Sequence, residues 1–148
     1  MEGDLVLCGT GIEELPEGLY VGGDLYMNNT NIKSIPANTY VGGKLDATGS
    51  ALEVVEEGVH VGGSLCLTNS QVKILPDNLY VGGNLNVRRT PLEALPAGLV
   101  VGGSLTLRRS GILTLPEDVQ VGEDLEIAET GINEVPESIV YGGRLIID

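Results

Sequence analysis

The feature that most constrains the fold is a five-residue stretch that returns every twenty residues along the chain. It reads Val-Gly-Gly-Asp-Leu at 21–25 and Val-Gly-Gly-Lys-Leu at 41–45, and it continues at 61–65, 81–85 and 101–105. Two looser copies follow at 121–125 and 141–145. A period of twenty over all 148 residues predicts a stack of one structural unit, so we expect a single repeat domain spanning 1–148.

Each unit favours strands over helices. Apolar residues alternate with Tyr20 and Tyr26 on either side of the glycine pair, and such alternation is typical of strands with one buried face. A glycine pair and a proline in most units leave no room for an ordinary helix. The leucine after each glycine pair would form one column at about 4.8 Å intervals. We therefore expect an all-β fold, a right-handed parallel β-solenoid of about seven coils with little or no helix.

The pattern L-x-L-x-x-T-x-I-x-x-L-P resembles the short, twenty-residue bacterial leucine-rich repeat. It stands at 25–36 as L-Y-M-N-N-T-N-I-K-S-I-P, and the resemblance covers essentially the whole chain. Thr or Ser replaces the family's ladder asparagine, and the Val-Gly-Gly bend replaces its second Leu-Pro region. Similar V-G-G repeats occur in bacterial and phage proteins of unassigned function. The departures favour a straighter coil with strands on more than one face.

The charge balance limits the classes of partner. The chain carries 21 acidic and 8 basic residues, for a formal net charge of −13. Because affinity for phosphate backbones comes from Lys and Arg, direct nucleic-acid binding is disfavoured. No apolar run has the length of a membrane span, and the N-terminus lacks a charged-then-apolar signal segment. We expect a soluble, cytoplasmic protein with no membrane partner.

Catalytic machinery is not indicated. The single histidine, His60, falls in a column of aromatic residues, where packing is commoner than catalysis. The glycine pairs lack the strand–loop–helix context of a phosphate-binding loop. Cys8 and Cys66 would lie three coils apart, about 14 Å, too far for a disulfide. We expect no catalytic residues, no metal ligands and no cofactor, and therefore no enzyme.

Half of the basic residues occupy the same two positions of two adjacent units: Arg88, Arg89, Arg108 and Arg109. In a stack their guanidinium groups would lie in rows about 4.8 Å apart and repel one another unless an anion joins them. Glu129 and Glu126 could relieve this repulsion, which would make the arginines a solvated surface ladder. Alternatively, the arginines bind an anion or an acidic partner, since their fork matches carboxylate and phosphate.

An aromatic column precedes the bend in four successive units: Tyr20, Tyr40, His60 and Tyr80. Tyrosine offers a large contact area with a polar tip and is favoured in interfaces. The alternative is that aromatic residues suit strand surfaces and stack on their neighbours. The column is therefore a second candidate for partner binding.

Acidic residues gather in the last full unit, among them Glu123, Asp124, Glu126 and Glu129. A metal site would need converging oxygens, whereas these carboxylates are distributed around a whole coil. This distribution favours a solvated or partner-facing surface. It also suggests an alternative function, a phage-type inhibitor of a host defence nuclease or complex that imitates nucleic acid.

A hydroxyl residue stands at one position of each unit: Thr10, Thr30, Ser50, Ser70, Thr90, Ser110 and Thr130. Regular threonine arrays can bind ice, but the outward strand column is irregular here. We expect the hydroxyls to satisfy backbone groups where the strand turns.

The final unit ends with Leu145, Ile146 and Ile147. An open solenoid end shows apolar columns and unpaired strand edges. We expect self-association through this coil, most simply as a twofold homodimer, with Ile146 as an exposed outward side chain. End-to-end assembly into a structural polymer is a second alternative function.

The repeat architecture, by analogy with other repeat families, predicts a non-enzymatic protein–protein interaction module. It would bind a protein partner through an extended face of the solenoid.

Overall fold

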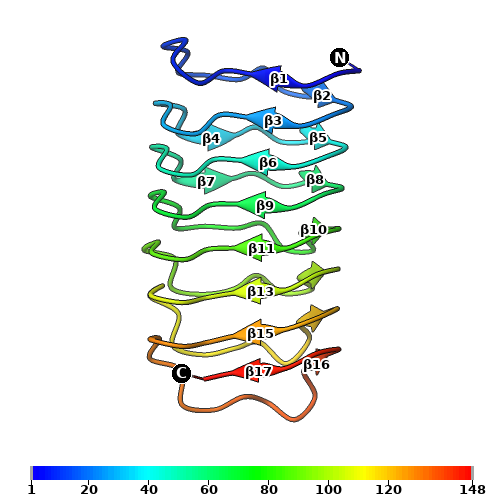
Figure 1. The fold of residues 1–148 in the computed structure, drawn as a ribbon, viewed down its shortest axis with the longest axis vertical. Helices are drawn as coiled ribbons and strands as arrows, with labels where there is room; N and C mark the ends of the chain where they lie inside the picture. Colours follow the sequence, from blue (N-terminus) through cyan, green and yellow to red (C-terminus); the bar gives the residue numbers. More distant parts are fainter. Residues whose placement is uncertain (1, 148) are drawn as a thin grey trace.

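The computed structural model describes residues 2–147, which form a right-handed parallel β-solenoid of about seven coils (Figure 1). Every regular element in this range is a strand of two residues, and no residue in it is helical. All strand pairings are parallel, and each residue pairs with the residue twenty positions away, as Leu85 does with Leu105. The expected fold class is confirmed.

The strands form two long sheets and one short one. The eight-stranded sheet has the order β1 (Leu5–Val6), β3 (Leu25–Tyr26), β6 (Leu45–Asp46), β9 (Leu65–Cys66), β11 (Leu85–Asn86), β13 (Leu105–Thr106), β15 (Leu125–Glu126) and β17 (Leu145–Ile146). The seven-stranded sheet has the order β16 (Val140–Tyr141), β14 (Gln120–Val121), β12 (Val100–Val101), β10 (Tyr80–Val81), β8 (His60–Val61), β5 (Tyr40–Val41) and β2 (Tyr20–Val21). The short sheet pairs β4 (Ser34–Ile35) with β7 (Val54–Val55).

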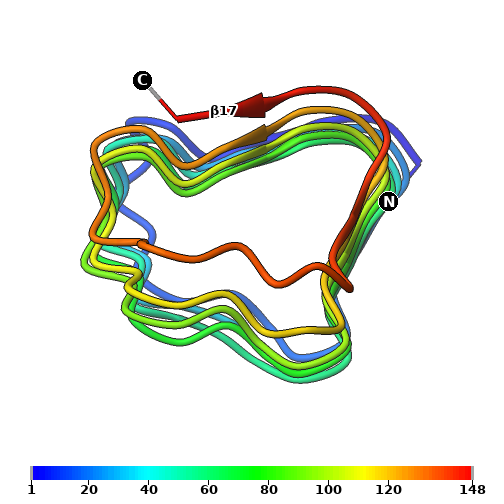
Figure 2. The same cartoon turned by 90° about the horizontal axis from the view of Figure 1, so that it is seen from below.

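Aliphatic side chains fill the interior that the coils enclose in the end-on view (Figure 2). The valine before each bend and the leucine after it are buried from Val21 and Leu25 through Val121 and Leu125. The other predicted apolar columns are buried in the central coils as well. Since one coil cannot bury its own apolar face, the core depends on contacts between successive coils.

The first glycine of the bend is required by the stacking itself. A Cβ on Gly82 would overlap the carbonyl oxygen of Gly62, and the same holds for its equivalents from Gly42 to Gly142. The second glycine is less constrained in most coils, because a Cβ on Gly103, for example, meets first the movable end of the Asn84 side chain; at Gly63 it would meet the backbone of Gly43. The chain accordingly places Glu123 at that second position.

A ladder of side-chain acceptors follows the bend, on the residue just before each strand of the eight-stranded sheet. Asp24 Oδ1 accepts from the amide of Lys44 (2.7 Å), and Asn84 Oδ1 accepts from the amide of Ser104 (2.8 Å). Asp4, Ser64, Ser104 and Asp124 accept in the same way from the next coil. Lys44 has no side-chain acceptor, so it cannot continue the ladder. This ladder was not among the sequence-based predictions.

Five of the seven residues of the hydroxyl column satisfy backbone groups of their own coil. The hydroxyls of Thr10, Thr30, Thr90 and Thr130 donate to the carbonyl three residues earlier, at 2.6–2.8 Å. Ser50 Oγ instead accepts from the amide of Leu52 at 3.3 Å. The predicted structural role is confirmed for these five residues. It is wrong for Ser70 and Ser110, whose hydroxyl oxygens are buried without a hydrogen-bond partner among the described residues.

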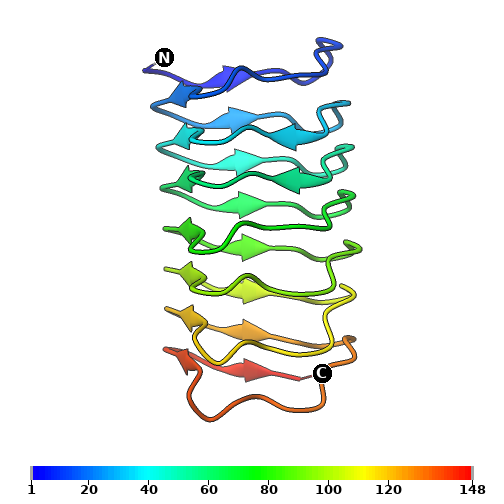
Figure 3. The ribbon, with the colours of Figure 1, turned by 180° about the vertical axis from the view of Figure 1, so that it is seen from behind.

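The third side of each coil runs from the hydroxyl column to the seven-stranded sheet (Figure 3). Beyond β4 and β7 its strand pairing continues only as a bridge between Val54 and Ile74 in the described residues. Ala51 N donates a hydrogen bond to Thr30 O of the preceding coil (3.0 Å). Pro91 occupies the equivalent position two coils later and has no amide hydrogen, so it cannot form this bond. In the last coil, segment 131–139 (orange in Figure 2) crosses the interior outline of the coils above, and Ile139 is buried there.

The bend contact yields a stability prediction. Gly82→Ala should lower the free energy of unfolding by about 2 kcal/mol or more, because the added methyl group forces consecutive bends apart. Gly3→Ala is the matched control, since nothing lies within 4 Å of a Cβ at Gly3. Urea denaturation followed by circular dichroism measures both. Equal, small losses in the two variants would show that close approach of the bends is not required.

Candidate functional site

The candidate surfaces lie on different sides of the solenoid. The arginine corner (Arg88, Arg89, Arg108 and Arg109) follows strands β11 and β13, at the edge where each coil turns away from the eight-stranded sheet. The aromatic ladder (Tyr20, Tyr40, His60 and Tyr80) lies on strands β2, β5, β8 and β10 at the other edge of the ring (Figure 1). The structure therefore does not combine the two predicted partner-binding sets into one site.

The aromatic ladder is one continuous stack. Ring centroids are 4.9 Å apart for Tyr20 and Tyr40, and 5.0 Å apart for Tyr40 and His60 and for His60 and Tyr80. The planes of successive rings differ by 6°, 1° and 14°. Register causes this geometry, because parallel pairing places each aromatic residue beside its equivalent in the next coil. Stacking covers the ring faces that lie between neighbours, while Tyr20, Tyr40 and Tyr80 stay partly exposed to solvent.

Aromatic residues of this chain are on the surface. The chain has five tyrosines and no Phe or Trp, and its core is aliphatic. Tyr20, Tyr40 and Tyr80 are 51%, 37% and 43% exposed, and none of the described tyrosines belongs to the buried core. Glycine bends border the ladder on one side, so the rings stand on a surface with few large side chains. The ladder is thus a rigid, raised aromatic strip.

One half of the arginine corner is neutralised within the protein. Arg108 Nε donates to Glu129 Oε1 at 3.0 Å, and Arg108 Nη2 contacts the same oxygen. Arg109 Nε donates to Glu129 Oε2. Glu126 Oε1 lies 4.0 Å from Arg108 Nη1. The hydrogen bond from Arg109, and to a smaller extent that from Arg108, lowers the pKa of Glu129 to about 2. The predicted relief by Glu129 and Glu126 is therefore present for this half.

The other half of the arginine corner has no such carboxylate. Arg88 and Arg89 form no ion pair with any of residues 2–147, and Arg88 Nε is hidden from solvent without a hydrogen-bond partner. The Glu129-equivalent position for this pair is occupied by Arg109. We refer to Arg88 and Arg89 as the open pair.

The backbone beneath the arginines is one that arginine rarely adopts. Arg89 and Arg109 have φ of 56° and 58°. Earlier coils place glycine or asparagine in this column, at Gly9, Asn29, Gly49 and Asn69. Those residues adopt the left-handed region at lower energy than arginine does. The sequence shows this column changing from Gly and Asn to Arg. That change could have identified the arginine corner as a candidate site without any argument from charge.

Most carboxylates of the acidic coil (Glu123, Asp124, Glu126 and Glu129) have arginine partners. Asp124 Oδ2 is 3.2 Å from Arg144 Nη2, and Asp124 Oδ1 accepts from the amide of Arg144 at 2.8 Å. The hydrogen bond from the Arg144 amide, and to a smaller extent that from its side chain, lowers the pKa of Asp124. Together with the contacts of Glu126 and Glu129 to Arg108, these pairs reduce the free negative charge of this coil.

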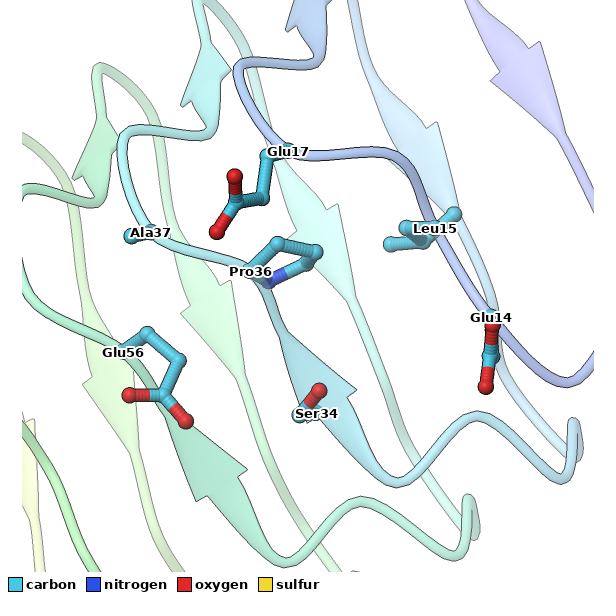
Figure 4. A pocket seen from close by; sticks show the side chains of 7 residues that line it. All are labelled: Glu14, Leu15, Glu17, Ser34, Pro36, Ala37 and Glu56. Carbon is cyan, nitrogen blue, oxygen red and sulfur yellow. The ribbon is translucent and has the colours of Figure 1, made fainter.

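The sequence is most acidic on the third side, which the sequence analysis did not single out. Positions 11–18 and their equivalents hold twelve of the 21 acidic residues and only two basic ones, Lys33 and Lys73. A shallow hollow of about 320 Å³ lies here, with the carboxylates of Glu17 and Glu56 on either side of Pro36 (Figure 4). No three His, Cys, Asp or Glu side chains among residues 2–147 are grouped to hold a metal ion.

The last coil differs from the expectation in one respect. Ile146 is half-buried on β17 rather than exposed, whereas Ile147 is 61% exposed. Ile147 belongs to an inward column, and its exposure arises because no further coil covers it in this structure. Leu145 is half-buried for the same reason. Self-association through these residues stays a prediction.

Neither described cysteine forms a disulfide. Cys8 Sγ donates to Asn28 Oδ1 at 2.7 Å, and Cys66 Sγ lies 3.1 Å from Thr48 Oγ1. The absence of a bridge between them agrees with the expected separation. Residues 2–147 also contain no helix of the length and apolar character needed to cross a bilayer.

Comparisons of the chain with protein-family models, with curated proteins and with solved structures found no match. The candidate surfaces are therefore interpreted from their own geometry.

The pairing of Glu129 yields a titration prediction. Arg109→Gln should raise the pKa of Glu129 from about 2 toward its ordinary value of 4.5, because the largest stabilising hydrogen bond to the carboxylate is lost. The lowered pKa means that this pairing stabilises the fold above pH 4.5 and that the stabilisation disappears as the pH falls toward 2.

A carboxyl-carbon NMR titration measures this change. Arg144→Gln is the matched control, since it should raise the pKa of Asp124 and leave that of Glu129 unchanged. An ordinary pKa for Glu129 in the unmodified protein would contradict the pairing.

Proposed function

We propose that this protein is a non-enzymatic protein-binding module whose partner docks along the aromatic ladder. The observation that carries the proposal is the continuous stack of Tyr20, Tyr40, His60 and Tyr80 on one face of the seven-stranded sheet. Three of the five tyrosines of the chain stand in this one column. Tyrosine is enriched in protein interfaces because it combines large contact area with a polar tip.

Rigidity makes the ladder suitable for binding. Each inner ring lies between two neighbours about 5 Å away, so its side-chain freedom is already restricted before a partner arrives. A preorganised surface loses less conformational entropy on association than a mobile one. Stacking between neighbouring strands also stabilises the sheet, by roughly 0.2–1 kcal/mol per pair. This contribution does not account for the choice of tyrosine, because Val100 and Val140 occupy the same column in later coils.

The acidic coil offers weaker support for the alternative of nucleic-acid mimicry. Three of its four named carboxylates lie within 4.0 Å of an arginine, which lowers the negative potential available to a partner. A mimic needs unpaired charges in a regular array, so we place partner binding at the aromatic ladder instead.

The proposal predicts the effect of replacing two rings by the residue that the column itself uses elsewhere. Tyr40→Val combined with Tyr80→Val should preserve the fold but abolish retention of the protein partner from a lysate of the source cells. Circular dichroism checks the fold, and affinity capture followed by mass spectrometry compares the retained proteins.

The control for this experiment is Ile74→Ser, which removes an apolar side chain that is 58% exposed on the third side. It should retain the same proteins as the unmodified chain. If the double variant also retains them, the ladder is only a structural stack and the proposal fails.

A further inference from the structure

Residues 2–147 contain a carboxylate clamp in which one arginine pair holds an anionic side chain. In that clamp Arg108 and Arg109 come from the turn after β13, and both guanidinium groups hold the carboxylate of Glu129 from the following coil. The two arginines bind different oxygens, Oε1 and Oε2. Arginine's planar fork favours such recognition of a carboxylate.

The open pair repeats the same arrangement one coil earlier. Arg88 and Arg89 are equivalent to Arg108 and Arg109, and Arg89 shares the left-handed backbone of Arg109. The turn is held by the bond from Arg88 N to Asn86 Oδ1 (2.9 Å) and by the bond from Arg89 N to Arg108 O (3.1 Å). The shared φ gives the second arginine of the open pair the same backbone conformation as that of the clamp.

Among residues 2–147, no carboxylate pairs with the open pair. Its register neighbours in the preceding coil are Thr68 and Asn69, and those in the following coil are Arg108 and Arg109. Arg108 Nε donates to Glu129, whereas the equivalent Nε of Arg88 is hidden from solvent and unpaired. An unpaired polar group of this kind is unfavourable, and an anion that accepts its hydrogen bond removes that cost. The half-exposed Arg88 side chain can turn toward such a ligand.

We propose that Arg88 and Arg89 form a docking site for a carboxylate of a partner protein's acidic segment, bound as Glu129 is bound by Arg108 and Arg109. The site is separate from the aromatic ladder and does not depend on it. A short acidic segment fits better than a nucleic acid, because the protein's net charge of −13 repels a long polyanion more strongly than a peptide with few charges.

A peptide titration tests the site directly. Acetylated tetraglutamate amide is added to ¹⁵N-labelled protein while the arginine Nε–H signals are followed by NMR. The signals of Arg88 and Arg89 should shift saturably, and that of Arg144, which is already paired with Asp124, should not. Arg88→Gln combined with Arg89→Gln should weaken binding at least about tenfold. No saturable shift at Arg88 or Arg89 would overturn the proposal.

A matched control and a competing ligand define the specificity. Lys33→Gln combined with Lys73→Gln removes the same charge from the third side and should leave peptide affinity unchanged. Equal weakening by this variant would mean that only net charge matters, against the proposal. An oligothymidylate of equal charge should bind more weakly than the peptide. Tighter binding of the oligothymidylate through Arg88 and Arg89 would replace the acidic-segment proposal with nucleic-acid binding.

A variant that supplies the open pair with a carboxylate of its own tests the geometry of the clamp. Arg109→Glu puts a carboxylate one coil after the open pair, in the relation that Glu129 has to Arg108 and Arg109. The introduced carboxylate should titrate well below the ordinary glutamate pKa of 4.5 and should weaken peptide binding at least about tenfold. An ordinary pKa for this carboxylate, together with unchanged peptide affinity, would show that the open pair is not a clamp. Circular dichroism confirms that the variant is folded.

Discussion

The structure depends on in-register parallel stacking, which places each residue against the residue twenty positions away. Residues at the same position of the repeat therefore stack on one another in every column. Aliphatic residues gain from this arrangement because their contacts are non-directional, and stacked rings gain because adjacent faces cover each other. Glycine at the first bend position allows consecutive backbones to approach, which lets all other columns come into contact.

In-register stacking is unfavourable for columns of residues with the same charge. Two arginines in one column repel each other, and only a carboxylate in the adjacent coil neutralises them, as Glu129 does. Acceptors such as Asp24 and Asn84 are compatible with stacking because the next coil always presents an amide. At the open pair, in-register stacking brings arginines of adjacent coils together, and no carboxylate of residues 2–147 pairs with Arg88 or Arg89.

The repeat made much of this predictable. Periodicity alone indicated the strands, the aliphatic columns and the contact between Glu129 and the arginines, because a residue's neighbours in a stack are known from the period. The acceptor ladder was missed since Asp24, Lys44 and Asn84 look like a mixed solvent-facing column, and their shared role appears only with backbone directions. The path of segment 131–139 was missed because the sequence pattern there is unbroken and gives no sign of a change.

The bend glycines also govern how such a chain can change in length. A Cβ at each first-position glycine from Gly42 to Gly142 would meet the bend of the preceding coil. Duplication or deletion of a complete 20-residue unit preserves every one of these contacts, whereas insertion of one residue would bring a side chain under a carbonyl oxygen. Recombination can therefore lengthen or shorten the solenoid only in whole coils, each of about 4.8 Å. Any surface built on one column is then carried intact to its new position along the axis.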